Sequence, residues 1–134
     1  MTIAEENRDP QLKGPLAGVR VIEMGQLLAG PFTTSRLADF GAEVIKVERP
    51  GMGDWSRQWG PFVTAVSLPF AGLNRNKRSL ALNLKDERGL QIMRQLVAQS
   101  DVLVHNFRPG AMEKLGLGYE DARTLNPRLG YASS

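Results

Sequence analysis

The sequence predicts an α/β fold, in which an open parallel sheet carries helices on both faces. After a polar start, short runs rich in β-branched residues alternate with segments of helical periodicity. The connections between successive strands are long enough to hold the crossover helices that parallel strands require. The first strand also passes through a glycine turn directly into a helix, an arrangement typical of nucleotide-type folds.

The first strand and helix organise the rest of the chain. Residues 19–22 predict a mostly buried strand, and Gly25 opens the turn that follows it. A helix begins at Gly30 and Pro31, since proline is tolerated at the first helical position, and it ends at Gly41. The helix start leaves backbone N–H groups and the positive end of a dipole at the carboxyl edge of the sheet. We therefore expect an anionic ligand at this edge.

The middle of the chain predicts two more strands separated by a long loop. Residues 42–48 form an apolar strand that ends in a turn cluster at 49–54. Residues 55–75 lose clear periodicity, so we expect a long ordered loop over a site or an interface. Residues 79–84 alternate with period two and predict the next strand.

The last third of the chain continues the alternation. Asp86 is expected to cap a helix whose apolar residues recur at helical spacing over 90–97, and residues 101–107 predict another strand. The remaining elements are expected to be a short helix that opens at 108–110 and runs through Leu115, a second short helix over 119–126, and a last strand over 128–134.

The domain organisation follows from these elements. Residues 1–14 are polar and aperiodic, and we expect a flexible N-terminal arm. Residues 15–134 are expected to be the N-terminal part of a larger Rossmann-like domain, because the chain stops at a strand beside the ligand edge. The expectation is therefore a truncated or divided larger protein.

Composition excludes several classes of site. The chain has no cysteine, which excludes disulfides, thiolate zinc sites and a cysteine nucleophile. His105 is the single histidine, so we expect no metal site. The lack of cysteine fits a reducing cytoplasm. The longest uncharged run, residues 58–74, contains helix breakers, and with no apolar core near the N-terminus we expect neither a membrane span nor a signal peptide.

Neither standard phosphate motif is complete. Gly25 and Gly30 have P-loop spacing, but Pro31 and Phe32 stand where that loop needs lysine and Ser/Thr, and G-x-G-x-x-G is absent. Glu48 has the position of a ribose-binding acid, although a surface glutamate is the favoured interpretation. Basic side chains recur near strand ends and could clamp a polyphosphate. They are Arg49, Arg57, Arg75, Lys77, Arg78, Arg108 and Lys114.

Several ordered motifs are similar to those of one family. The chain resembles the class III CoA-transferases, which include the formyl-CoA and carnitine CoA-transferases. The matching stretches are 15–21 (PLAGVRV), 28–31 (LAGP), 37–50 (LADFGAEVIKVERP), 74–82 (NRNKRSLAL), 101–110 (DVLVHNFRPG), 116–119 (GLGY) and 126–129 (NPRL).

The resemblance implies coenzyme A as the ligand, whose phosphates would meet the basic side chains. Lys114 stands where formyl-CoA transferases carry an arginine, and lysine lacks the bidentate geometry of arginine. Leu28 stands where they carry a glutamine, which argues against formyl or oxalyl chemistry. The implied CoA contacts are Leu28, Ala29, Arg49, Leu82, Lys85, Asn106, Phe107, Arg108 and Lys114.

The resemblance also implies a mechanism and partners. The family nucleophile is an aspartate that attacks the acyl-CoA thioester, and it lies beyond residue 134. We therefore assign no catalytic residue here, and the segment alone is expected to bind without turnover. His105 is expected to be structural. The implied substrates are an acyl-CoA and a carboxylic acid, and the implied assembly is an interlocked homodimer.

Two alternatives remain at this point. An α-methylacyl-CoA racemase of the same family would abstract an α-proton and form no anhydride. A non-enzymatic nucleotide- or nucleic-acid-binding module would use the basic residues 75–78. This tetrad lacks interleaved aromatic residues and the net charge is only +3, so we expect no nucleic-acid partner.

Overall fold

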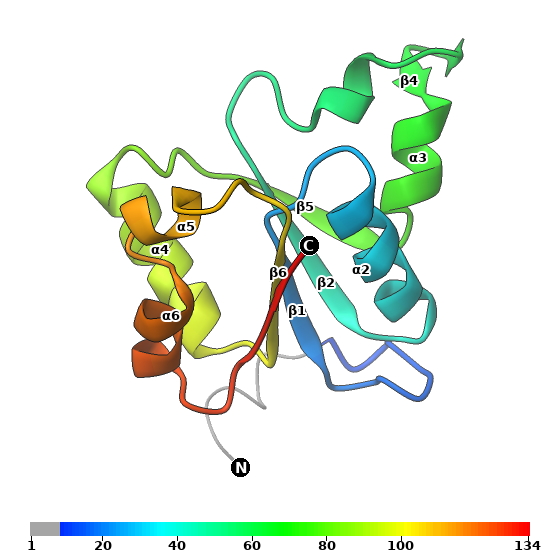
Figure 1. The fold of residues 1–134 in the computed structure, drawn as a ribbon. Coiled ribbons are helices and arrows are strands. Elements are labelled where there is room, and N and C mark those ends of the chain that lie inside the picture. The colour runs from blue at the N-terminus through cyan, green and yellow to red at the C-terminus, as the bar shows by residue number, and fades with distance from the viewer. Residues whose placement is uncertain (1–8) are drawn as a thin grey trace.

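A computed structural model describes residues 9–134 of the chain (Figure 1). Most of the expected N-terminal arm, residues 1–8, lies outside the described residues. The chain then packs against the main body, where the backbone N–H of Leu16 donates to the carbonyl of Phe40 over 2.9 Å. Gly14 lies so close to Phe40 that an added Cβ would collide with its carbonyl group.

The described residues form the parallel sheet that the sequence predicts. The strand order is β5-β2-β1-β6-β7, and every pairing is parallel. The chain starts in the middle of the sheet, moves to one edge and then crosses to the other side of β1. The point of reversal lies between β1 and β6, where open α/β sheets bind ligands. The strands are β1 (Arg20–Glu23), β2 (Glu43–Glu48), β5 (Lys77–Ala81), β6 (Val102–His105) and β7 (Gly130–Ser133).

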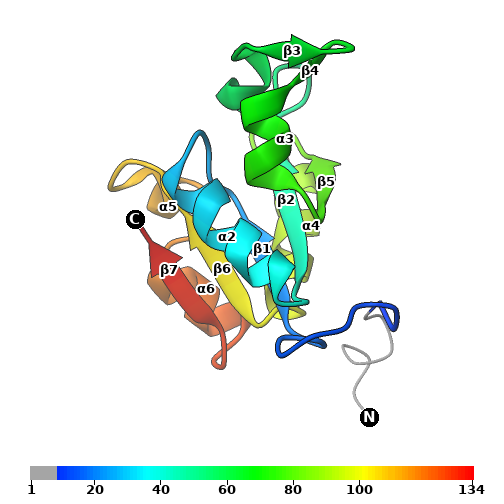
Figure 2. The ribbon, with the colours of Figure 1, turned by 90° about the vertical axis from the view of Figure 1, so that its right-hand side faces the viewer.

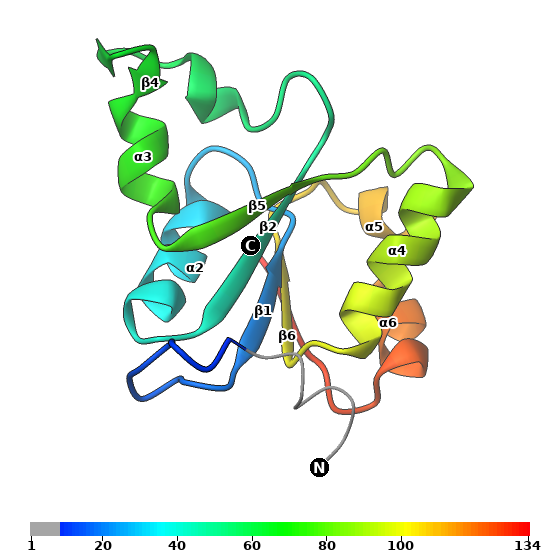
Figure 3. The same ribbon diagram turned by 180° about the vertical axis from the view of Figure 1, so that it is seen from behind.

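Helices cover both faces of this sheet, as expected (Figures 1 and 3). One face carries α2 (Ala29–Asp39), with α3 (Leu68–Asn74) beside it. The side chain of Asp86 accepts a hydrogen bond from the N–H of Arg88 and so caps α4, as the sequence predicts. The opposite face carries α4 (Glu87–Ala98), α5 (Ala111–Lys114) and α6 (Tyr119–Leu125).

Alternation along the strands divides the core between the two faces. In β1, Val21 packs with Ala38 of α2. Ile22 packs on the other face, in the cluster that contains Leu103 of β6 and Met93 of α4. Successive strand residues point to opposite faces, so one short strand supplies both clusters. Val21 and Ile22 are both fully buried, because β1 lies inside the sheet with helices packed on both faces.

The third predicted strand is displaced toward the N-terminus. The prediction was residues 79–84, but β5 covers Lys77–Ala81, with Lys77 opposite Val44 of β2. A pattern of apolar residues cannot include Lys77, because a lysine is expected in solvent. In the structure the Lys77 side chain is buried and forms an ion pair with Glu23. Residues 82–84 therefore lie beyond the strand, at the carboxyl edge of the sheet.

The expected long loop contains regular structure and projects from the body (Figure 2). We call residues 55–74 the projecting unit. It begins with a 3-10 helix, η1 (Trp55–Gln58), and continues through an antiparallel hairpin of β3 (Phe62–Val63) and β4 (Val66–Ser67) into α3. The hydroxyl of Ser67 accepts from the N–H of Phe70 and so starts α3. These elements are too short for sequence periodicity to reveal them.

Candidate functional site

A cavity of about 240 Å³ opens at the carboxyl edge of the sheet. Its position agrees with the rule that open α/β sheets bind ligands beyond the carboxyl ends of their strands. Segments that follow four different elements meet there. They are residues 24–26 after β1, residues 47–49 at the end of β2 with Gly53 and Asp54 beyond it, residues 82–85 after β5, and Phe107 after β6 with Leu115 after α5.

The cavity combines apolar walls with basic side chains at its rim. Met24, Leu82 and Phe107 contribute apolar surface, and Met24 and Leu82 are almost completely buried. Arg49 and Lys85 are exposed at the rim. The Arg49 guanidinium lies 5.3 Å from the ring centroid of Trp55, so an aromatic side chain orients it. Such a site suits a ligand with an apolar ring and an anionic end.

Four of the implied CoA contacts line this cavity: Arg49, Leu82, Lys85 and Phe107. Leu28 and Ala29 lie at the start of α2, exposed and close in sequence to the lining residue Gln26. Lys114 is exposed on α5, beside the lining residue Leu115.

The side chain of Asn106 has a structural role that the sequence does not reveal. Its Oδ1 accepts from the backbone N–H of Gln26 at 2.8 Å, and its Nδ2 donates to the carbonyl of Gln26 at 2.7 Å. The carboxamide therefore holds the turn after β1 in the manner of a backbone pair. Its side-chain polar groups are used within the protein.

Arg108 lines an adjoining cavity of about 440 Å³ beyond β6 and β7. Phe107 borders both cavities, and His105 and Tyr131 also line the second one. The His105 ring packs edge-on against Tyr131 at 5.3 Å between centroids. Burial lowers the pKa of His105, although the charge of Glu113 acts in the opposite direction. A buried neutral histidine in an aromatic cluster fits the structural role expected from the sequence.

Four of the seven basic side chains that could clamp a polyphosphate are engaged in ion pairs within the protein. Each of the four forms an ion pair with a carboxylate of the protein, and one of these carboxylates, Glu48, itself lines the cavity. Lys77 and Arg78 also lie at the start of β5, and the amino end of a parallel strand is opposite to the carboxyl edge where the cavity opens. The pairs are Arg57 with Glu48 (2.6 Å), Arg75 with Asp39 (2.6 Å), Lys77 with Glu23 (2.8 Å) and Arg78 with Glu43 (2.8 Å).

Glu48 is not the surface glutamate that the sequence favours. Its carboxylate is buried and receives hydrogen bonds from Arg57, from the hydroxyl of Ser79 and from the N–H of Asp54. Burial raises the pKa of Glu48, but these hydrogen bonds outweigh it and the net pKa is lowered. The carboxylate anchors the start of the projecting unit and is not available for a ribose.

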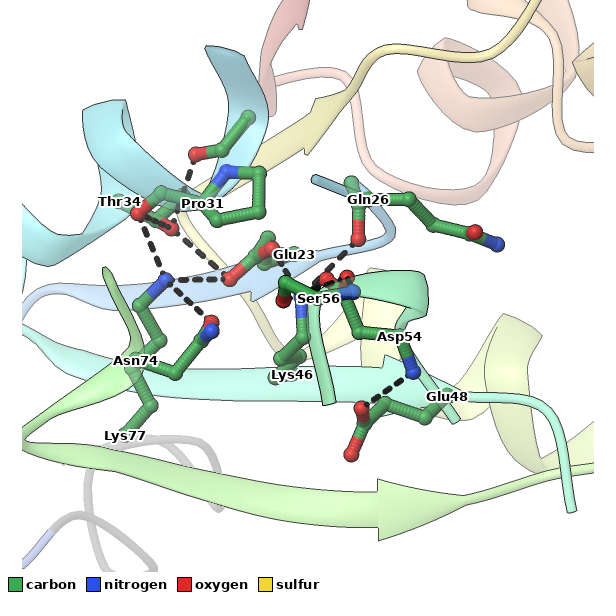
Figure 4. A network of polar contacts seen from close by, with 12 residues as sticks. Glu23, Gln26, Pro31, Thr34, Lys46, Glu48, Asp54, Ser56, Asn74 and Lys77 are labelled. Carbon is green, nitrogen blue, oxygen red and sulfur yellow. Dashed lines mark hydrogen bonds and ion pairs between the residues drawn. The ribbon is translucent and has the colours of Figure 1, made fainter. Parts of the chain in front are cut away.

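A buried polar network lies beneath the turn after β1, and sequence reasoning missed it (Figure 4). Its charged members are Glu23, Lys46, Asp54 and Lys77, whose side chains are at most 2% exposed. Lys46 Nζ lies 2.7 Å from Glu23 Oε1 and 2.8 Å from Asp54 Oδ2. The available signal was Glu23 directly after the apolar pair Val21 and Ile22, and Lys46 between Ile45 and Val47, since charged side chains among buried residues are rare unless they are paired.

Residues 9–134 offer neither a metal centre nor a membrane-spanning helix. Within residues 9–134, no group of His, Asp or Glu side chains could hold a metal ion. Over the same residues, no helix has both the length and the apolar character needed to cross a membrane.

Comparison with known proteins agrees with the sequence resemblance. The chain is 52% identical over 120 residues to the succinyl-CoA:glutarate CoA-transferase of Mus musculus, covering 89% of this chain and 28% of that protein. It is 51% identical over 122 residues to the acetyl-CoA:oxalate CoA-transferase of Acetobacter aceti, covering 91% of this chain and 31% of that protein. The chain thus spans about a third or less of these relatives.

A solved structure shares the fold. The crystal structure of a CAIB/BAIF family protein from Brucella suis superposes with a TM-score of 0.84 at 42% sequence identity, covering 90% of this chain and 33% of that one. The sequence profile described as CoA-transferase family III matches residues 16–134, which is nearly the whole described region. The chain therefore belongs to CoA-transferase family III.

Proposed function

We propose that this chain is the CoA-binding N-terminal portion of an acyl-CoA:carboxylate CoA-transferase. The observation that carries the proposal is the cavity at the carboxyl edge, where Arg49 and Lys85 stand over apolar walls. The relatives compared above are named as transferases that act on succinyl-CoA with glutarate or on acetyl-CoA with oxalate. Their names support transfer chemistry over the racemase alternative.

The adenine ring and the phosphates of coenzyme A each have a matching surface in this proposal. The adenine ring would pack against the apolar side chains of Leu82 and Phe107, and the phosphates would meet Arg49 and Lys85. Leu28 and Ala29 would approach the ligand from the start of α2, where the helix dipole favours a negative charge. Asn106 would act by holding Gln26 in place.

The chemical step would use an aspartate beyond residue 134. Its carboxylate oxygen would attack the thioester carbonyl carbon, the C–S bond would break, and CoA would leave as a thiolate with an acyl-aspartyl anhydride remaining. The carboxylates of Glu23, Glu48 and Asp54 are unsuited to this role because they are buried and each forms an ion pair within the protein. This chain would hold the CoA moiety and present its thioester.

Charge reversal at Arg49 tests the proposed ligand. Arg49→Glu is expected to weaken CoA binding about tenfold or more, because it replaces a guanidinium with a carboxylate beside phosphate. Isothermal titration calorimetry measures the change. Arg123→Glu, an identical charge change on an exposed position of α6, should leave the affinity unaltered.

Two results would argue against this function. Equal CoA affinity in Arg49→Glu and the unmodified protein would remove the arginine from the site. Binding of a random oligonucleotide as tight as CoA binding, and lost with added salt, would favour the nucleic-acid module instead.

We also propose self-association through the projecting unit, in keeping with the dimers implied by the resemblance. Its exposed apolar side chains include Phe62, Val63 and Val66, each about half exposed. The protein is expected to sediment as a dimer or larger species, and Phe62→Lys with Val66→Lys should shift it toward the monomer. A monomeric unmodified protein would contradict this expectation.

A further inference from the structure

The turn after β1 is held by side chains that come from three distant parts of the chain. Lys46 Nζ donates to the carbonyl of Gly25 at 3.0 Å. The carboxamide of Asn106 pairs with both backbone groups of Gln26, and the N–H of Leu27 donates to Asp54 Oδ1 at 3.1 Å. Three successive residues of the turn therefore have backbone groups fixed by long-range contacts.

Leu27 is the residue at which this support is most needed. Its φ is +63°, in the left-handed region that L side chains other than Asn and Asp rarely adopt. Such a conformation persists where the surrounding structure over-determines it. The hydrogen bond to Asp54 is the long-range contact made by its backbone N–H.

Asp54 is itself held rigidly. Its Oδ1 also accepts from the N–H and the hydroxyl of Ser56, both at 2.8 Å, and its Oδ2 forms the ion pair with Lys46. Lys46 also forms an ion pair with Glu23 Oε1, and Glu23 Oε2 lies 2.8 Å from Lys77 Nζ (Figure 4). The carboxylate at the turn is thus part of a charge-balanced unit that spans three strands.

The same network anchors both ends of the projecting unit. At its start, Ser56 binds Asp54. At its end, Asn74 Oδ1 accepts from Lys77 Nζ at 3.0 Å, and Lys77 also donates to the carbonyl of Pro31 in the first turn of α2 at 2.7 Å. The turn, the start of α2 and the projecting unit are therefore parts of one polar assembly.

We propose that Asp54 is a positioning residue for the ligand site: it holds Leu27 in the left-handed conformation and thereby places Gln26, Leu28 and Ala29 at the cavity. Gln26 and Asp54 both line the cavity, and Leu28 and Ala29 follow the turn directly. The inference rests on the proposed function, because the ligand placed by the turn is coenzyme A. Asp54 itself acts through the backbone and takes no part in the reaction.

Two readouts on Asp54→Ala separate positioning from general stability. Without CoA, amide hydrogen exchange at Leu27 is expected to accelerate at least about tenfold more than exchange in α4, because the N–H of Leu27 loses its acceptor whereas the N–H groups of α4 keep theirs. CoA affinity by calorimetry is expected to fall about tenfold. Asp54→Asn keeps an Oδ1 acceptor but loses the ion pair with Lys46; it is expected to give smaller changes in the same direction and serves if the alanine variant does not fold.

A destabilised control and a rescue complete the design. Val97→Ala removes methyl groups from the fully buried core position on α4, so it lowers stability without touching the turn. Its CoA affinity should match that of the unmodified protein under conditions in which both are folded. Adding Leu27→Gly to Asp54→Ala should restore part of the affinity, because glycine adopts positive φ without a Cβ penalty.

The outcomes distinguish the two proposals. Uniform acceleration of exchange across Leu27 and α4 in Asp54→Ala, or CoA affinity unchanged in that variant, would overturn the positioning role. Absence of CoA binding by the unmodified protein would overturn the proposed function. If CoA does not bind, the amide hydrogen exchange rate at Leu27 still tests whether Asp54 holds the turn.

Discussion

Lys46→Met is expected to lower the free energy of unfolding by about 3–5 kcal/mol, the cost of breaking a buried ion pair by removing one partner. Lys46 is 1% exposed and lies between the carboxylates of Glu23 and Asp54. Methionine fills much of the same volume, so the effect isolates the charge. The substitution leaves Glu23 with one cationic partner, Lys77, and leaves Asp54 with no cationic partner in the described network.

Urea denaturation at neutral pH measures this loss. Arg94→Met is the matched control, because Arg94 forms an ion pair with Glu87 in which both side chains are substantially exposed. Such pairs are worth about 0–1 kcal/mol. A loss for Lys46→Met as small as that of the control would show that the buried network contributes little to stability.

The loss in Lys46→Met is also expected to depend on pH. Burial raises the pKa of Asp54, but its bonds to Lys46 and Ser56 outweigh burial, so the net pKa falls below the ordinary value of 3.8. The unmodified protein therefore loses stability as acid protonates Asp54. Without Lys46 the buried carboxylate favours its protonated form, and the variant gains relative stability in acid. The difference between the two should shrink as the pH falls below about 4.

Gly89→Ala is expected to destabilise the protein by about 1–3 kcal/mol, the usual cost of overpacking a filled site. This sign is opposite to that of an ordinary helix position, where alanine gains about 1 kcal/mol over glycine. Gly89 lies in the first turn of α4, and an added Cβ would overlap the carbonyl oxygen of Asn83 and lie 2.9 Å from its carbon. Backbone atoms cannot rotate away, so the segment must shift.

The same change should weaken CoA binding, because residues 82–85 line the proposed site. Gly72→Ala in α3 is the control, since an added Cβ there meets nothing within 4 Å. It should be neutral or stabilising by up to about 1 kcal/mol. Urea denaturation and calorimetry on both variants measure the two effects. Equal changes in stability for Gly89→Ala and Gly72→Ala would mean that the backbone at Asn83 shifts at little energetic cost.

The elements that the sequence predicts well are those whose burial follows a regular period. The strand expected at residues 42–48 is β2 (Glu43–Glu48), and the helix expected from Gly30 to Gly41 is α2 (Ala29–Asp39). Apolar alternation and glycine or proline at the ends carry enough local information for these assignments. The cavity residues Arg49 and Leu82 followed from the family resemblance, which draws on more than local pattern.

The elements that sequence reasoning misplaced depend on contacts between distant residues. The start of β5 at Lys77 is stabilised by Glu23, and local pattern cannot show that a lysine is buried by a partner on another strand. The basic residues Arg57 and Arg75 looked free to bind phosphate, but their partners Glu48 and Asp39 become neighbours only after folding.

The amino-acid sequence by itself determined the α/β class, the principal strands and helices and the family of this protein, because hydrophobic periodicity and ordered motifs are properties of the chain. The tertiary structure alone decided which charges meet. Asp54 reaches Lys46 and Leu27, and Asn106 reaches Gln26, because parallel strands distant in sequence end at one edge of the sheet. Electrostatic pairing depends on distance in space, and that distance is set only when the sheet assembles.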